Sequence, residues 1–170
     1  YPYDALTGEG VVFALPASQQ ARENGAFAER LNLASAALSL ADIRDDGKAS
    51  GEIMAILWND SQVDCNRKGT FWLSATPDEV SKGWDAGYMR TATWGEFTIK
   101  ATKQKFFYLN THVDNTGKLA QVQSMHLIKE KVKELNPYGF PVIITGDFNA
   151  ELSHAMFEPF EDWLDDARST

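Results

Sequence analysis

Cysteine is nearly absent from the sequence, since Cys65 is the one thiol in 170 residues. An intrachain disulfide and a cysteine-cluster metal site are both excluded, because each needs at least two thiols. The lack of disulfides does not decide the compartment, since secreted proteins do not all carry them. We expect Cys65 to be a small side chain within a β-strand.

Long apolar runs are absent as well. No stretch of about 18 apolar residues occurs, so the sequence encodes no membrane-spanning helix. The chain begins Tyr1-Pro2-Tyr3-Asp4, without Met, a basic segment or an apolar segment. These residues do not resemble a signal peptide, and we expect a processed or trimmed start.

Basic residues are scarce: 16 Lys and Arg residues stand against 24 Asp and Glu residues, for a formal net charge of −8. This charge opposes, without excluding, binding to long nucleic acids, whose phosphates repel an acidic surface. An acidic surplus also suits a protein that gathers carboxylates around a hard divalent cation.

No repeat, low-complexity tract or long linker divides the sequence, and its length suits one domain over residues 1–170. The composition changes near residue 42. The Ala-rich stretch 16–40 predicts a helix, and residues 44–51 are rich in turn formers. Strands are expected to dominate the rest of the chain.

Four apolar, aromatic or β-branched stretches predict strands, at residues 52–58, 71–73, 91–100 and 105–110. Residues 121–135 carry apolar side chains at three- and four-residue spacing, which predicts an amphipathic helix that ends before Pro137. The continuous apolar run 141–145 then predicts a strand buried on both faces. A strand, a helix and a further strand in this order indicate an α/β fold.

The predicted strand 141–145 ends at the turn Gly146-Asp147-Phe148-Asn149. Open α/β sheets gather ligand-binding groups at the carboxyl ends of their strands. The Asp147 carboxylate is a hard oxygen ligand or a hydrogen-bond acceptor for water, and the Asn149 amide can donate to a phosphate oxygen. An ordinary Asx turn explains the same pattern, and that alternative stays open.

His112 follows the predicted strand 105–110, one βαβ-length step before Gly146. Because both strand ends would project to one edge of the sheet, we expect His112 to face Asp147. A structural or solvated histidine is the alternative. His126 falls within the helix pattern and His154 in a loop or short helix, so both are predicted to be non-catalytic.

Two motifs together resemble the endonuclease/exonuclease/phosphatase (DNase I-like) superfamily. Asn110-Thr111-His112-Val113-Asp114 is similar to the family's Asn-Thr-His-x-Asp element, and Gly146-Asp147-Phe148-Asn149 resembles its Gly-Asp-Phe-Asn element. Further stretches resemble a secreted or periplasmic bacterial branch, at residues 45–52, 69–74, 82–85 and 90–94. The resemblance implies an α/β sandwich of two packed β-sheets flanked by helices, and it favours a secreted or periplasmic location.

The resemblance also implies in-line water attack on a phosphate ester with Mg²⁺, or with Mn²⁺ or Ca²⁺, neutralising the developing charge. Catalytic roles would fall on His112 at the scissile phosphate, on Glu52 bonded to its ring, and on Asp147. Asp147 would orient the attacking water or help to hold the metal. Phosphate binding would fall on three further residues, Asn149, Arg90 and Asn110.

Other interpretations remain for several of these residues. Glu52 also fits a salt-bridged residue at a strand end, and Arg90 fits an ordinary surface arginine beside a strand. Four aromatic residues are expected in the core: Trp72, Trp84, Tyr88 and Trp94. The alternative is that some of them stack on a substrate, and Tyr88 and Trp84 are the better candidates for that role. The acidic residues from Glu158 onward are expected on a solvated helix face.

The sequence departs from the family at both ends. Residues 1–42 match poorly and show no strand followed by a metal-site Asn or Glu, and nothing after Asn149 matches the family's Ser-Asp-His element. Since the family fold takes on the order of 250 residues, we expect a partial domain that acts as a monomer on a phosphate-ester substrate of unknown size. The alternatives are an inactive relative or fragment that binds an anionic ligand, and an unrelated α/β domain that matches by chance.

Overall fold

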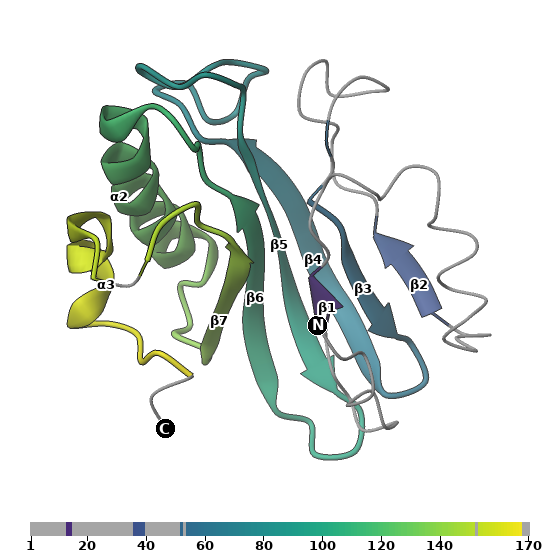
Figure 1. The fold of residues 1–170 in the computed structure, drawn as a ribbon. Coiled ribbons are helices and arrows are strands. Elements are labelled where there is room, and N and C mark those ends of the chain that lie inside the picture. The colour runs from purple at the N-terminus through teal and green to yellow at the C-terminus, as the bar shows by residue number, and fades with distance from the viewer. Residues whose placement is uncertain (1–12, 15–35, 40–51, 53, 152, 168–170) are drawn as a thin grey trace.

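The computed structural model describes residues 13–14, 36–39, 52, 54–151 and 153–167. These residues form a larger and a smaller β-sheet, one long helix and two short helical segments (Figure 1). In chain order the elements are β1 (Phe13–Ala14), β2 (Ala36–Ser39), β3 (Ile56–Asn59), β4 (Val63–Trp72), β5 (Thr91–Ile99), β6 (Lys105–His112), α2 (Lys118–Leu135), β7 (Val142–Asp147), the 3₁₀ segment η3 (Ala155–Phe157) and α3 (Glu158–Glu161).

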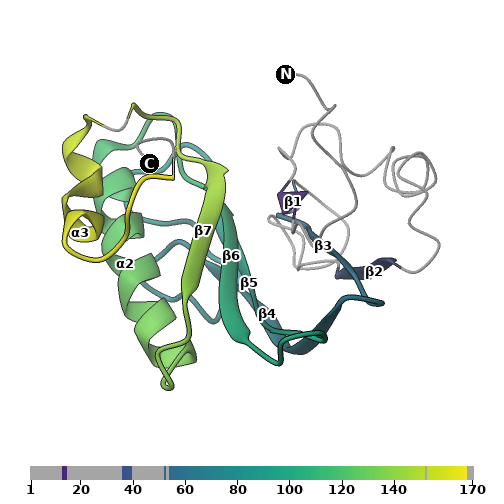
Figure 2. The same ribbon diagram turned by 90° about the horizontal axis from the view of Figure 1, so that it is seen from below.

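The larger sheet has the strand order β4-β5-β6-β7 and the smaller sheet the order β1-β3-β2. Strands β4, β5 and β6 are antiparallel neighbours, whereas β7 lies parallel to β6 after the crossover through α2. Figure 2 shows α2 and α3 on one side of the larger sheet and β3 on the other. Two packed sheets with helices on the outer face of one of them confirm the predicted α/β sandwich.

The face of the larger sheet that meets α2 buries the main core. Along each strand, successive side chains point to opposite faces of the sheet. On the face toward α2, Trp94 of β5 stacks on Phe107 of β6, with ring centroids 5.5 Å apart. From the helix, Met125, Ile128 and Val132 enter the same core at three- and four-residue spacing and are at most 1% exposed. The spacing that predicted the helix therefore also fixes the face that it buries.

The opposite face of the larger sheet packs against the smaller sheet. Ile56 and Trp58 of β3 join a buried cluster with Phe97 and Tyr108 of the larger sheet. The Trp58 and Phe97 rings meet edge to face, with centroids 5.5 Å apart. This second core carries the segment before β3 to the edge where β6 and β7 end.

The predicted strands 91–100 and 105–110 and the predicted helix 121–135 are confirmed, each with its ends shifted by a few residues. Strand β4 begins at Val63 instead of residue 71, and Cys65 lies within it as expected. Its middle residues are polar and exposed, so the apolar pattern revealed only its buried end. No helix among the described residues is long and apolar enough to cross a bilayer.

Two sequence predictions about secondary structure are wrong. Residues 36–39 of the predicted helix 16–40 form strand β2, paired with β3; residues 16–35 and 40 lie outside the described part. Strand β7 is not buried on both faces, since Ile143 is 46% exposed. The reason is that β7 is an edge strand: within the described residues it pairs with β6 alone. The predicted loop 44–51 lies outside the described residues, and the strand predicted at 52–58 begins at Ile56.

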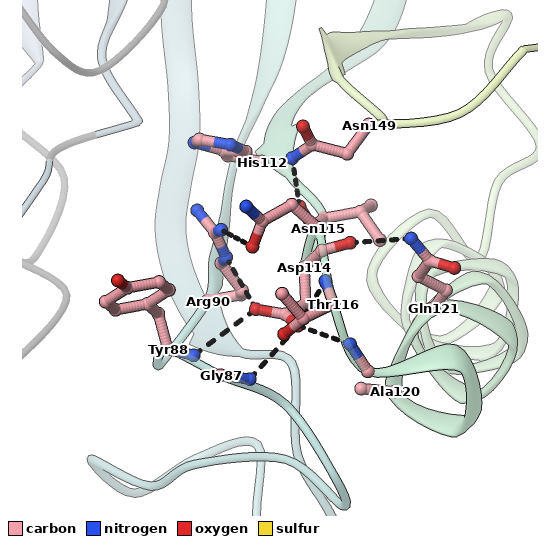
Figure 3. Close-up of polar contacts among 12 residues, drawn as sticks. Gly87, Tyr88, Arg90, His112, Asp114, Asn115, Thr116, Ala120, Gln121 and Asn149 are labelled. Carbon is pink, nitrogen blue, oxygen red and sulfur yellow. Dashed lines mark hydrogen bonds and ion pairs between the residues drawn. The ribbon is translucent and has the colours of Figure 1, made fainter.

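Two carboxylates, the exposed Asp85 and the buried Asp114, hold the loop between β4 and β5 against the start of α2. The helix begins after Gly117, which has no side chain to cap it, and Asp85 from the loop accepts the N–H groups of Ala120 at 2.7 Å and Leu119 at 3.3 Å. Asp114 accepts hydrogen bonds from the other end of the same loop and from the turn after β6 (Figure 3). The loop that precedes β5 is thereby fixed beside the end of β6.

The Asp114 carboxylate is 1% exposed but well supplied with donors. Burial by itself raises the pKa of a carboxyl group. Hydrogen bonds from the backbone N–H groups of Gly117, Gly87 and Thr116 and from the Thr116 hydroxyl outweigh that effect, and they hold the pKa of Asp114 well below its ordinary value. Asp114 is therefore a buried anion at neutral pH.

A buried methionine at the centre of α2 tests the main core. Met125→Ala should lower the free energy of unfolding by about 2–5 kcal/mol, because Met125 is fully buried and its removal leaves a cavity. Leu119→Ala, on the same helix but 51% exposed, is the matched control and should cost less than about 1 kcal/mol. Urea unfolding monitored by tryptophan fluorescence measures both. Equal losses for the two variants would contradict the packing described.

The hydrogen bonds to Asp114 should make the free energy of unfolding depend on pH in the acidic range. The folded-state pKa is depressed, so this contribution is fully present above the ordinary aspartate pKa of about 3.9 and is lost as the pH falls below it. Asp114→Asn should be less stable than wild type by about 1–3 kcal/mol at neutral pH, with a flatter decline between pH 5 and lower values. Urea unfolding across this pH range measures the effect. Parallel stability profiles for the two proteins would rule it out.

Candidate active site

Five of the six predicted site residues meet at the edge of the larger sheet where β6 and β7 end. The parallel register of these strands pairs His112 directly with Asp147. The His112 Nε2 atom lies 3.8 Å from the Asp147 Oδ2 atom, a separation longer than a hydrogen bond. The Asp147 side chain is 49% exposed and that of His112 is 17% exposed, so the pair opens to solvent on the carboxylate side.

Glu52 approaches the other nitrogen of the His112 ring. Its Oε2 atom lies 3.4 Å from His112 Nδ1, and it comes from the segment before β3. The site is therefore assembled from both sheets, with one carboxylate on each side of the imidazole. A carboxylate at Nδ1 favours a proton on that nitrogen and restrains the ring orientation.

Arg90 lies beneath this group, at the start of β5, with 6% of its side chain exposed. Its guanidinium contacts three oxygen groups. Nη1 lies 3.5 Å from Glu52 Oε2. Figure 3 shows the other two contacts: Nε lies 3.3 Å from Asp114 Oδ1, and Nη2 donates to Asn115 Oδ1 at 3.4 Å. The alternative of a surface arginine is therefore wrong. Arg90 is a buried cation between two carboxylates.

The turn after β7 depends on a glycine. Gly146 has φ 146°, and a Cβ atom at this position would lie 1.9 Å from the Thr111 carbonyl oxygen of β6. Asn149 follows with φ 51°, a conformation that asparagine tolerates better than most residues. These two residues bring Asp147 and the following backbone close to β6.

Asn149 closes this turn through both of its amide-type donors. Its backbone N–H donates to Asp147 Oδ1 at 2.9 Å, which is the Asx-turn bond. Its side-chain Nδ2 donates to the Val113 carbonyl oxygen at 2.9 Å. The Asx turn thus exists, and it occurs in the same residues that line the candidate site.

Asn110 is the predicted site residue that the structure does not bring to the others. It is 1% exposed, and its Nδ2 atom donates to the Ala55 carbonyl oxygen at 3.1 Å, across the interface between the two sheets. Its Oδ1 atom lies 3.5 Å from the Thr145 hydroxyl group of β7. These contacts tie β6 to the smaller sheet and to β7 below the site.

The other aromatic residues and histidines considered for the site lie either in the core or at the surface. Trp72 and Trp94 are buried core residues, as the strand pattern predicted. Tyr88 is 55% exposed, with its ring 5.6 Å from the centre of the Arg90 guanidinium. His126 lies exposed on α2, and His154 caps η3 by accepting the Met156 N–H at 3.2 Å, so neither belongs to the site.

The sequence patterns predict no role for Asp114 or Asn115, although both residues contact Arg90. A signal was present: Asp114 lies two residues after His112 and is followed by the turn-forming run Asn115-Thr116-Gly117. Their contact with Arg90 spans the distance from the end of β6 to the start of β5. Such a long-range contact is not visible in a local pattern.

The described residues do not by themselves complete a metal site. No group of three or more His, Cys, Asp or Glu side chains in that part of the chain is arranged to hold a metal ion. Asp147 offers one accessible carboxylate, and hard divalent cations take several oxygen ligands.

Comparison with solved structures identifies the relatives of this chain. An endonuclease/exonuclease/phosphatase family protein from Bacteroides thetaiotaomicron is 41% identical, with a TM-score of 0.75 over 81% of this chain and 50% of that chain. A mannosyl-6-phosphatase from the same species is 40% identical, with a TM-score of 0.73 over 79% and 51%. The human Nocturnin catalytic domain shares the fold at 14% identity, with a TM-score of 0.68 over 88% and 55%.

The chain spans about half the length of these structures. No family model and no curated protein matches its sequence. The two Bacteroides relatives share 40% identity or more with this chain over about four fifths of its length. The chain therefore belongs to the endonuclease/exonuclease/phosphatase superfamily and has its DNase I-like fold.

Proposed function

We propose that the protein hydrolyses a phosphate ester by in-line attack of water, with His112 and Asp147 at the reacting group. The observation that carries the proposal is the placement of the His112 imidazole between the carboxylates of Glu52 and Asp147, at the open edge of the sheet. The relatives add support, since one of them is named as a mannosyl-6-phosphatase. Proton transfer next to an accessible carboxylate is the chemistry that such a group can provide.

Each residue has a distinct part in this proposal. Asp147 uses Oδ1 to accept the Asn149 N–H, and its other oxygen, Oδ2, faces His112. Because the two groups are 3.8 Å apart, a water molecule can bond to both, whereas a phosphate oxygen can accept a hydrogen bond from His112 alone. His112 holds a proton on Nδ1 against Glu52 and exchanges one with the substrate at Nε2.

Arg90 supplies positive charge close to the phosphate. Its guanidinium is oriented by three oxygen groups, so it acts through a fixed field beneath the site as well as through any direct contact. Asn149 and Asn110 complete the proposed phosphate-binding set. Asn149 borders the site directly, whereas Asn110 supports β6 from below and would need to exchange the Ala55 carbonyl for a phosphate oxygen.

We also propose dependence on a divalent cation, Mg²⁺ or alternatively Mn²⁺ or Ca²⁺. The accessible carboxylate of Asp147 is a suitable oxygen ligand, and the net charge of −8 favours cation binding. When bound, the cation would neutralise charge that develops on the phosphoryl oxygens. The second candidate function, binding of an anionic ligand without hydrolysis, is favoured by the incomplete set of metal ligands among the described residues.

The leading proposal is tested with two chromogenic esters, p-nitrophenyl phosphate and bis-p-nitrophenyl phosphate, in the presence of Mg²⁺ or Mn²⁺. His112→Ala should lower kcat by about 10²- to 10⁴-fold, because it removes the group that transfers the proton. His126→Ala is the matched control, since His126 is an exposed helix residue, and it should retain the wild-type rate. Equal rates for wild type and His112→Ala would favour the binding function instead.

Removal of metal tests the cation requirement separately. Treatment with EDTA followed by desalting should abolish hydrolysis of the same esters, and addition of Mg²⁺, Mn²⁺ or Ca²⁺ should restore it. Asp147→Asn should raise the cation concentration that gives half-maximal rate, because an amide is a weaker ligand than a carboxylate. A rate that is insensitive to EDTA would refute metal dependence while leaving the roles of the side chains intact.

A further inference from the structure

The two carboxylate oxygens of Asp114 accept different sets of hydrogen bonds. The Oδ2 atom accepts four hydrogen bonds that fasten loops, from Gly87 N at 3.1 Å, Thr116 N at 3.1 Å, Thr116 Oγ1 at 3.0 Å and Gly117 N at 2.8 Å. The Oδ1 atom accepts from Tyr88 N and from Arg90 Nε, each at 3.3 Å. Figure 3 shows the carboxylate between the loop that carries Tyr88 and the turn that leads into α2. Four of the five loop contacts thus fall on Oδ2, whereas the contact with Arg90 shares Oδ1 with the Tyr88 N–H.

The contact with Arg90 leads to the candidate catalytic histidine through one more residue. The guanidinium group is planar and rigid, so a bond at Nε sets the direction of Nη1. Nη1 lies 3.5 Å from Glu52 Oε2, and that same oxygen lies 3.4 Å from His112 Nδ1. Asp114, Arg90, Glu52 and His112 therefore form a continuous series of contacts in which a carboxylate stands on either side of the cation.

The charge of Asp114, the second carboxylate beside Arg90, affects how closely Arg90 pairs with Glu52. A buried arginine is drawn strongly to any carboxylate within reach, and Glu52 Oε2 is shared between Arg90 and His112. Asp114 satisfies Arg90 at Nε with a full negative charge, which allows the guanidinium to remain 3.5 Å from Glu52. Without that charge, Arg90 would be expected to pair closely with Glu52 and to draw its oxygen away from the imidazole.

From these contacts we propose that Asp114 is a positioning residue for His112, acting through Arg90 and Glu52. The inference rests on the proposed function of the site, because the consequence of positioning is a faster chemical step. Asp114 does not touch the substrate: it is 1% exposed and lies on the far side of Arg90 from the imidazole. A role limited to loop anchoring is the competing explanation.

Asp114→Asn separates the contact with Arg90 from most of the loop anchoring because the side chains have the same shape. The four donors around Oδ2 keep the amide oxygen on that side. The amide NH₂ group then faces Arg90 Nε–H and the Tyr88 N–H, a donor against two donors, so the variant keeps the four bonds at the amide oxygen and loses the contacts with Arg90 and Tyr88. Thr116→Val is the matched control, since it removes one anchoring bond and leaves the Asp114 charge and the Arg90 contact in place.

Two measurements on the full chain test the proposal. The first is the ¹H–¹⁵N signal of Arg90 Nε–H, assigned from its disappearance in Arg90→Lys; we expect it to be protected from solvent exchange in wild type and in Thr116→Val, and lost in Asp114→Asn. The second is hydrolysis of bis-p-nitrophenyl phosphate. Asp114→Asn should lower kcat by roughly 10- to 100-fold with KM changed by less than about twofold, and Thr116→Val should change neither.

The outcomes separate the explanations. An unchanged Arg90 signal and rate in Asp114→Asn, or an equal loss of kcat in Thr116→Val, would overturn the proposal in favour of anchoring alone. If Asp114→Asn does not fold, the wild-type Arg90 Nε–H signal decides: protection from solvent exchange supports the contact with Asp114, and rapid exchange overturns the proposal. If wild type hydrolyses neither ester, the proposed function fails, and the Arg90 signal still decides whether Asp114 holds the guanidinium.

Discussion

The parallel pairing of β6 with β7 is the constraint on which the candidate site depends. It places His112 opposite Asp147, and the close approach of Gly146 to the Thr111 carbonyl keeps the two strand ends together up to their last residues. A parallel pair needs a crossover, and α2 provides it by burying one apolar face on the same sheet. The hydrophobic packing of the helix and the position of the imidazole are thus consequences of a single topology.

The second requirement is that the two sheets pack on each other. Glu52 reaches the His112 ring only because Ile56 and Trp58 of the following strand are buried against the larger sheet, and the contact between Asn110 and the Ala55 carbonyl holds the same segment in place. Because Glu52 precedes a strand of the smaller sheet and His112 ends a strand of the larger sheet, the distance between them changes with small shifts of one sheet against the other. Buried polar contacts such as that of Asn110 restrict these shifts because they are costly to leave unmade.

Much of this arrangement could be predicted from the sequence, and the rest could not for physical reasons. Residues 121–135 and 91–100 have strong periodicity, and the position of His112 and Asp147 follows from where their strands end. The apolar pattern predicts only the buried end of β4, because the rest of that strand is polar and exposed. It predicts burial of β7 on both faces, because an apolar run does not reveal how many neighbours a strand has. The environment of Arg90 depends on contacts with Asp114 and Glu52, which no local pattern contains.

The charges at the candidate site are arranged differently from what the acidic net charge of the chain suggests. The described carboxylates around the imidazole are not equivalent: Asp114 is buried and satisfied by backbone donors, Glu52 shares a cation and a histidine, and Asp147 is half exposed. Asp147 is the most exposed of the three, whereas Glu52 and Asp114 contact Arg90, and Glu52 also lies beside His112. Under the proposed function, a phosphate dianion at this edge would lie near the Arg90 guanidinium, whose charge would offset the repulsion expected from a net charge of −8. Local arrangement of charge, more than the total, therefore determines what this edge of the sheet can bind.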